Sequence, residues 1–211
     1  MTSLARRPAI PPSPSPLAGI LQLQPGRAHE FCGPARRTLA VWAMALRAGS
    51  GPVIWLRPGW SGEYLHPQGL NDWASPEGMI IVTPQREAEA LGCAEEALRS
   101  GAVALVVVEL SAPPALTPLR RLHLAAEAGL ARRANKDMWG LVLTPEMGGA
   151  PGVESRWHLA PCCASDQIRG QIRGQIAPDI TPAWRLERLR ARMAPKAAWH
   201  VTATLEVTEA A

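Results

Sequence analysis

A short run of residues near the N-terminus has the residue types of a phosphate-binding loop. The segment HEFCGPARRTLA begins at residue 29, and an apolar stretch leads there into a glycine turn, two cations and a hydroxyl. These are Gly33, Pro34, Arg36, Arg37 and Thr38. In such loops, backbone N–H groups surround the phosphates, a lysine contacts the terminal phosphates and a hydroxyl holds Mg²⁺. The order of residue types therefore predicts an anion or nucleotide site at the start of a helix.

The same loop departs from a working phosphate-binding loop. It is about two residues shorter than G-x-x-x-x-G-K-[ST] and lacks the second glycine. Arg37 stands where the lysine belongs, and a planar guanidinium does not replace a compact ammonium. Hydrolysis needs every one of these parts. We therefore expect no ATP hydrolysis and no resident cofactor. Two readings of Arg36 and Arg37 stay open: a weak anion or ATP site at the helix N-terminus, or a solvated helix start.

A second group of cations lies near the C-terminus, with Glu187 as the only acidic residue among them. Its members are Arg185, Arg188, Arg190, Arg192 and Lys196. Such a patch can follow a nucleic-acid backbone, or it can be a solvated strand pair or a protein interface, and we favour the protein interface. The four cysteines have no zinc-site spacing, so no metal site is expected and the thiols are interpreted as reduced and mostly buried.

The elements that must position these residues alternate between strand and helix. Apolar runs predict strands at 28–32, 53–57, 79–83, 102–110 and 139–144. Helical spacing predicts helices at 36–48, 86–100 and 117–133, the last with Thr117 as N-cap. The run at 102–110 is apolar throughout, which is typical of a parallel strand covered on both faces. The fold class is therefore α/β with a mainly parallel central sheet flanked by helices.

The two ends of the chain differ from this pattern. Strands without long helices between them are expected at 153–160, 183–192 and 198–207, which indicates a C-terminal antiparallel β hairpin extension. A tandem QIRG repeat at 167–174 is interpreted as part of a surface loop. Residues 1–25 hold six prolines, which favours an extended or disordered tail. The folded domain is then expected to cover 26–211.

Composition limits the class of protein further. Hydrophobic residues make up 47% of the 211 residues, the net charge is +4, and arginine greatly outnumbers lysine. The longest aliphatic run is far too short to cross a bilayer, and prolines replace the apolar segment of a secretory signal. We therefore expect a cytoplasmic protein without membrane partners.

Four segments together resemble the core of the RecA-type ATPases. They are PGRAHEFCGP at 25–34, EALGCAEEALRSGAVALVVVEL at 89–110, TPEMGGAPGVESRWHLAP at 144–161 and RLRARMAPKAAWHV at 188–201. The resemblance covers most of 25–205. The phrases HEFCGPARRTLA, SGAVALVVVEL and GGAPGVESRWHLAP resemble one branch more closely, the ImuA proteins, which are RecA-related accessory factors of a damage-inducible mutagenesis cassette.

The resemblance implies roles for several residues. The fold would be a RecA-like P-loop NTPase core with a degenerate nucleotide site. Glu109 takes the place of the aspartate that holds Mg²⁺. The family carries its catalytic glutamate directly after the second strand, and this chain has no carboxylate there before Glu63. Arg190 and Arg192 match basic residues that in RecA reach a neighbour's nucleotide. The stretch at 144–161 occupies the place of the second DNA-binding loop and the strand after it.

The resemblance also implies a function and partners. ImuA works with ImuB, a Y-family-like polymerase that lacks catalysis, and with an error-prone replicative polymerase subunit, and RecA is a further candidate partner. The expected function is a non-catalytic adaptor in SOS-induced mutagenesis and translesion synthesis, near the nucleoid during DNA damage. DNA binding is expected to be weak or indirect, because the loop at 146–152 has no cation and no aromatic. The alternatives are a DNA-dependent ATPase related to RecA and a cell-division inhibitor like SulA.

Overall fold

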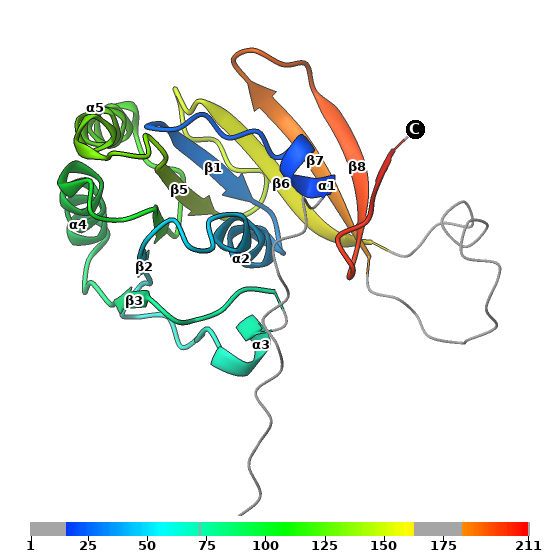
Figure 1. The fold of residues 1–211 in the computed structure, drawn as a ribbon, viewed down its shortest axis with the longest axis horizontal. Helices are drawn as coiled ribbons and strands as arrows, with labels where there is room; N and C mark the ends of the chain where they lie inside the picture. The colour runs from blue at the N-terminus through cyan, green and yellow to red at the C-terminus, as the bar shows by residue number, and fades with distance from the viewer. Residues whose placement is uncertain (1–15, 72, 163–182, 211) are drawn as a thin grey trace, which may run out of the picture.

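A single nine-stranded sheet organises the part of the chain that the computed structural model describes, residues 16–71, 73–162 and 183–210 (Figure 1). The strands are β1 (Ala28–Cys32), β2 (Val53–Leu56), β3 (Met79–Val82), β4 (Leu105–Glu109), β5 (Trp139–Thr144), β6 (Ser155–Cys162), β7 (Ala183–Ala191), β8 (Ala197–Thr202) and β9 (Val207–Glu209). The helices are α1 (Pro16–Ile20), α2 (Arg36–Leu46), α3 (Pro67–Asn71), α4 (Glu87–Ser100) and α5 (Leu116–Arg132).

The strand order is β3-β2-β4-β5-β1-β6-β7-β8-β9. The pairs from β3 to β6 are parallel, and those from β6 to β9 are antiparallel. The predicted α/β class, with a mainly parallel sheet and an antiparallel C-terminal extension, is therefore confirmed. β1 lies in the middle of the sheet, so the loop that follows it opens at the centre of the molecule.

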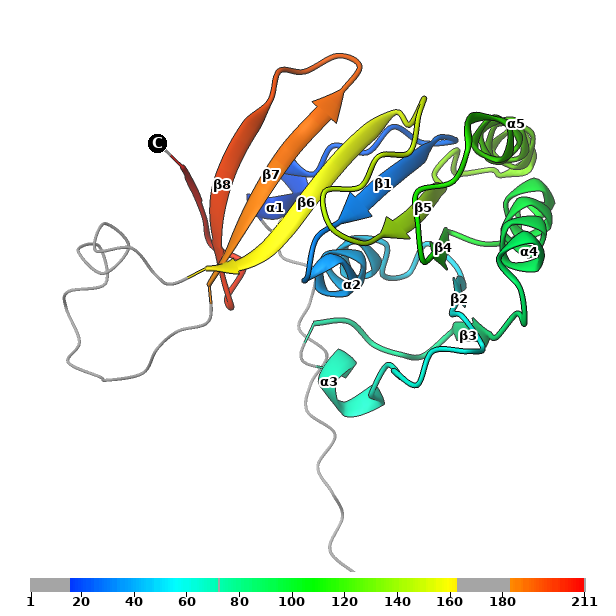
Figure 2. The ribbon, with the colours of Figure 1, turned by 180° about the vertical axis from the view of Figure 1, so that it is seen from behind.

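Helices cover both faces of the parallel part of the sheet. α4 and α5 pack on one face, and α1 and α2 pack on the other (Figures 1 and 2). All five residues of β4 and all six of β5 are buried. Burial on both faces explains why these strands read as continuous apolar runs.

Part of the predicted Pro-rich tail belongs to the folded domain, because α1 starts at Pro16, before the predicted boundary at residue 26. α1 inserts Leu17, which is 0% exposed, into the core beside α2, and Leu21 and Leu23 are buried after it. The prolines hid this short apolar segment. Residues 1–15 and the QIRG repeat lie outside the described residues.

Two local predictions in the second half are also wrong. The strand expected at 198–207 is two strands, because the chain turns between β8 and β9 with Leu205 at φ +60°. The N-cap of α5 is Ala115 and not Thr117, and it makes no side-chain capping bond. Thr117 lies within the first turn of that helix.

The C-terminal strands share the main core. Leu186 and Val201 are fully buried with residues of α2 and β1. Trp184 of β7 packs edge-on against Trp42 of α2 and against Trp73, with ring centroids 5.3 and 6.0 Å apart. The antiparallel extension is therefore a structural part of the domain.

The described residues hold no group of His, Cys, Asp and Glu side chains suited to a metal ion, and none of their helices is long and apolar enough to cross a membrane. Burial raises the pKa of the Cys32 thiol to about 12, as expected for an inert thiol. Cys93 is exposed, contrary to that expectation.

Candidate functional site

The loop between β1 and α2 is pressed against β6. Gly33 has φ +93°, and a Cβ atom there would lie 2.6 Å from the carbonyl oxygen of Leu159, so only glycine fits. The N–H of Ala35 donates to that same Leu159 carbonyl at 3.0 Å, and the N–H of Arg36 donates to the carbonyl of Gly33 at 3.3 Å. Two N–H groups that a phosphate loop would turn toward a ligand are thus bonded within the protein.

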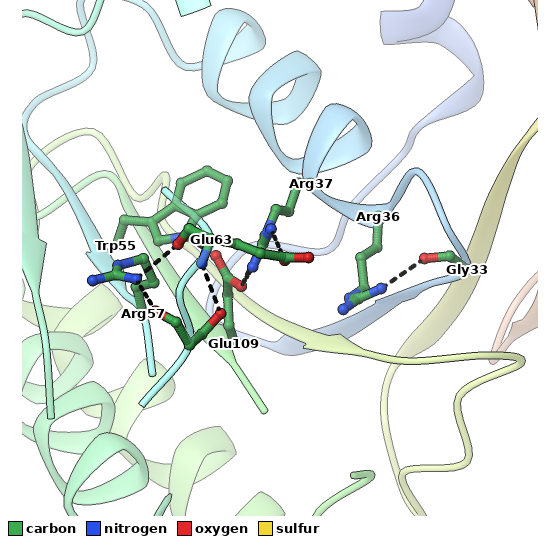
Figure 3. A network of polar contacts seen from close by, with 8 residues as sticks. Gly33, Arg36, Arg37, Trp55, Arg57, Glu63 and Glu109 are labelled. Atoms are coloured by element: carbon green, nitrogen blue, oxygen red, sulfur yellow. Dashed lines mark hydrogen bonds and ion pairs between the residues drawn. The ribbon is translucent and has the colours of Figure 1, made fainter. Parts of the chain in front are cut away.

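Arg37 is bound by two carboxylates of the chain itself (Figure 3). Its Nε and Nη2 donate to Oε2 of Glu109 at 2.9 and 2.7 Å, and its Nη1 donates to Glu63. The side chain of Glu109 is 5% exposed and that of Glu63 is 70% exposed. Burial alone would lower the pKa of Arg37, but its bonds to Glu109 and Glu63 outweigh burial and raise that pKa.

Glu109 is fixed on its other side by a tryptophan. Its Oε1 accepts the indole N–H of Trp55 at 2.7 Å. Trp55 is buried in β2, the strand beside β4 in the sheet. Both oxygens of this buried carboxylate are therefore hydrogen-bonded, as a buried charge requires.

Glu63 reaches the site because Arg57 shapes the loop after β2. Arg57 is 6% exposed and donates to the carbonyls of Ser61 and Glu63 at 2.8 and 2.7 Å. Its guanidinium also lies 4.1 Å from the ring centroid of Tyr64. Sequence reasoning noted Glu63 only as a carboxylate beyond the catalytic position, and it missed Trp55 and Arg57. The available signal for Arg57 was its place directly after the apolar strand β2, where a charged residue needs bonding partners.

The remaining predicted residues surround this network without joining it. Arg36 turns away from Arg37 and donates to the carbonyl of Gly33 at 3.1 Å (Figure 3). Thr38 is half-buried in the first turn of α2, and Pro34 is exposed. The structure thus brings Arg37 and Glu109 together with Glu63, which was not among the predicted site residues.

This donor set does not fit the phosphates of a nucleotide. Arg37 already faces two carboxylates of the chain, so its positive charge is not left over for a phosphate. A phosphate there would have to displace Glu63 and approach Glu109. Of the two readings of Arg37, a ligand anion or solvent, neither describes its surroundings, because the anions are the chain's own carboxylates.

The loop expected in the place of a DNA-binding loop is fastened to β1 through a buried carboxylate. Glu30 is 0% exposed. It accepts the Thr144 hydroxyl at 2.7 Å and the N–H groups of Gly149 and Ala150 at 2.9 and 3.1 Å, and it pairs with Arg156. The loop from 145 to 152 is therefore held in one shape by its own backbone donors.

Three of the five C-terminal cations are engaged by other side chains of the protein. The Arg188 guanidinium lies over the stacked rings of Trp157 and Trp199, at 5.6 and 5.2 Å from their centroids. Arg185 pairs with Glu187 at 3.2 Å, and Arg192 lies 3.6 Å from Glu154. Within the described residues, no ion pair is recorded for Arg190 or Lys196. These two are the members of the patch whose charge is open to a partner.

Comparison with known proteins supports the architecture. The sequence matches no protein-family model, and comparison with curated proteins gives no match. Among solved structures, the chain is similar to the crystal structure of the RadB recombinase, with a TM-score of 0.54, 16% sequence identity, and coverage of 89% of this chain and 92% of that chain. The fold is RecA-like. The structure of SulA from Pseudomonas aeruginosa also matches, with a TM-score of 0.44, 17% identity, and coverage of 56% of this chain and 98% of that chain.

The RecA-like fold sets the closed network in context. Arg37 follows the loop after β1, and Glu109 is the last residue of β4. The sequence resemblance assigned these positions to a phosphate-contacting cation and a metal-holding carboxylate. Here the two side chains bond directly to each other.

Proposed function

We propose that this chain is a non-catalytic RecA-like adaptor in SOS-induced mutagenesis and translesion DNA synthesis. Its partner would be an ImuB-like, catalytically inactive relative of the Y-family polymerases, acting with an error-prone replicative polymerase subunit. The observation that carries the non-catalytic part is the binding of Arg37 by Glu63 and Glu109. The choice of partner rests on the ImuA-like sequence phrases.

The network supports an adaptor because Arg37 and Glu109, the groups that nucleotide chemistry would need, are bonded to each other. Phosphoryl transfer depends on a cation at the phosphates and a carboxylate on Mg²⁺. Here these two charges neutralise each other inside the protein. A RecA-like core that does not turn over nucleotide would act through the partners that its surface binds.

The first experiment measures phosphate release by the purified chain with ATP, Mg²⁺ and single-stranded DNA. We expect the same rate for wild type, Arg37→Ala and a blank without protein. Turnover in the wild type that Arg37→Ala abolishes would overturn the non-catalytic assignment, provided that both proteins unfold cooperatively.

The second experiment tests the adaptor role by pull-down of the polymerase-like partner with the tagged full-length chain. We expect a stable complex that the double variant Arg190→Glu, Lys196→Glu weakens, because neither cation makes an ion pair with any of the described residues. Arg86→Glu is the control, since Arg86 lies at the start of α4 and its side chain is 79% exposed. No complex with the wild type would refute the adaptor role.

A further inference from the structure

The outer face of α5 carries a stripe of two exposed leucines with an arginine between them. Leu116 and Leu124 are 38% and 65% exposed, and Arg120 lies midway between them. Residues four apart lie on one face of a helix, so the stripe extends over roughly 12 Å. The buried face of the same helix is complete without it, because Leu119, Leu122 and neighbouring alanines fill the core.

A groove of about 390 Å³ lies beside this stripe. Leu116, Arg120 and Leu124 line it from α5, and Arg27, Glu154 and Arg192 line it from the segments that flank β1, β6 and β7. The groove shares no lining residue with the Arg37 network and shares only Arg192 with the C-terminal cations. Its volume suits a few side chains of an inserted segment.

Among the charged residues that line the groove, Arg120 is the arginine without a carboxylate partner in the described part of the chain. Arg27 pairs with Glu127, and Arg192 lies 3.6 Å from Glu154. His123 hydrogen-bonds to the N–H of Ala28 and to the carbonyl of Gly152, and burial lowers its pKa. Within the described residues, Arg120 has no recorded ion pair or hydrogen bond. An unpaired guanidinium therefore stands between two exposed leucines.

We propose that this groove binds an amphipathic helical segment of the partner protein, with an acidic residue placed between apolar residues four positions away on either side. The acidic side chain would pair with Arg120, and the apolar ones would cover Leu116 and Leu124. The partner's existence rests on the proposed adaptor function, and the inference adds a second contact surface to the one at Arg190 and Lys196. Arg27 and Arg192 are paired with the two glutamates of the groove, so Arg120 is the one unpaired arginine of its described lining, which disfavours a nucleic-acid backbone.

The test measures binding of the full-length chain to the purified polymerase-like partner, and then to overlapping synthetic peptides that cover the partner's sequence, by fluorescence anisotropy. We expect Arg120→Glu and Leu124→Asp each to weaken binding at least tenfold. Met147→Asp changes an exposed apolar residue that is not among the groove's lining residues, and we expect it to bind within twofold of wild type. A basic substitution at the acidic position of the bound peptide should restore binding to Arg120→Glu.

Each outcome has a distinct meaning. Normal partner binding by Arg120→Glu and Leu124→Asp overturns the groove and leaves the adaptor role intact. Failure of the wild type to bind the partner refutes the adaptor role and removes the groove's occupant with it. Unchanged partner binding together with lost binding of a single-stranded oligonucleotide would assign the groove to nucleic acid, against the proposal. We expect equal melting temperatures for all variants, because both substituted side chains are exposed. Equal melting temperatures exclude misfolding as the cause of weaker binding.

Discussion

Arg37 is hydrogen-bonded to two glutamates, so its replacement should lower the free energy of unfolding. Arg37→Ala leaves the buried carboxylate of Glu109 with only the indole of Trp55, and an unpaired buried charge is costly. Because Arg37 is 26% exposed, water offsets part of this loss, and we expect a decrease of about 2 kcal/mol in the free energy of unfolding. Chemical denaturation measures it.

The matched control is Glu63→Gln, which removes the other carboxylate on Arg37. Glu63 is 70% exposed, and exposed ion pairs contribute about 0.5 kcal/mol or less. If Arg37→Ala costs no more than Glu63→Gln, the contact with Glu109 does not stabilise the fold.

Sequence reasoning located part of this site and missed the rest for a physical reason. Gly33, Arg37 and Glu109 lie at element ends that periodicity can find. The position of Glu63 depends on the path of an irregular loop, which Arg57 determines through bonds to backbone carbonyls. Loop paths of this kind follow from tertiary contacts and leave no periodic signal.

His29 should make stability depend on pH. Its ring is fully buried between the Ser155 hydroxyl and the Gln24 carbonyl. Burial lowers its pKa to about 4 from 6.5, and the Gln24 hydrogen bond opposes only part of this. Between these values the unfolded chain binds more protons than the folded one. The free energy of unfolding should therefore fall as pH drops from 6.5 towards 4, by about 3 kcal/mol in total.

Denaturation curves across this pH range test the prediction, with His29→Gln expected to flatten the slope. The lowered pKa of His123 acts in the same direction, so some slope should remain. His66→Gln is the control, because His66 is exposed. A slope unchanged by His29→Gln would contradict the assignment.

At the scale of elements, the loop from 145 to 152 depends on glycine beside Glu30. Gly148 has φ +68°, and a Cβ atom there would lie 2.7 Å from Glu30 Oε1. Gly148→Ala combines backbone strain with a clash against a buried carboxylate, so we expect a loss of at least about 2 kcal/mol. Gly62→Ala, where no atom lies within 4 Å, should change stability little. Equal melting temperatures for the two variants would show that the loop does not depend on Glu30.

Periodicity predicted most elements because their burial is regular. β4 and β5 are buried throughout, and α4 and α5 each present one apolar face. α1 escaped prediction because it is five residues long and lies next to prolines. The break between β8 and β9 also escaped, since a polar turn inside an alternating pattern does not alter the pattern on either side.

At the scale of the whole molecule, the C-terminal strands should be required for folding. Removing residues 183–211 would take Leu186, Val201 and Trp184 out of the core and expose the apolar face of β6. We expect that fragment to lose cooperative unfolding, as followed by tryptophan fluorescence. Removing only 207–211 deletes the partly exposed β9 and should preserve cooperativity. A cooperative 1–182 fragment would show that the extension is dispensable.

The central position of β1 has a consequence for how the chain is made. β1 lies between β5 and β6. Its Glu30 bonds to Thr144 and Arg156, which follow it in the sequence by 114 and 126 positions. At roughly 5–20 residues per second, β1 is synthesised on the order of ten seconds before both of its neighbours exist. The middle strand of the sheet is thus the first described strand to be translated, and it waits for both of its neighbours. Pairing of β1 along both of its edges is therefore timed by the ribosome's passage through β6, and the sheet is completed only when β7, β8 and β9 follow.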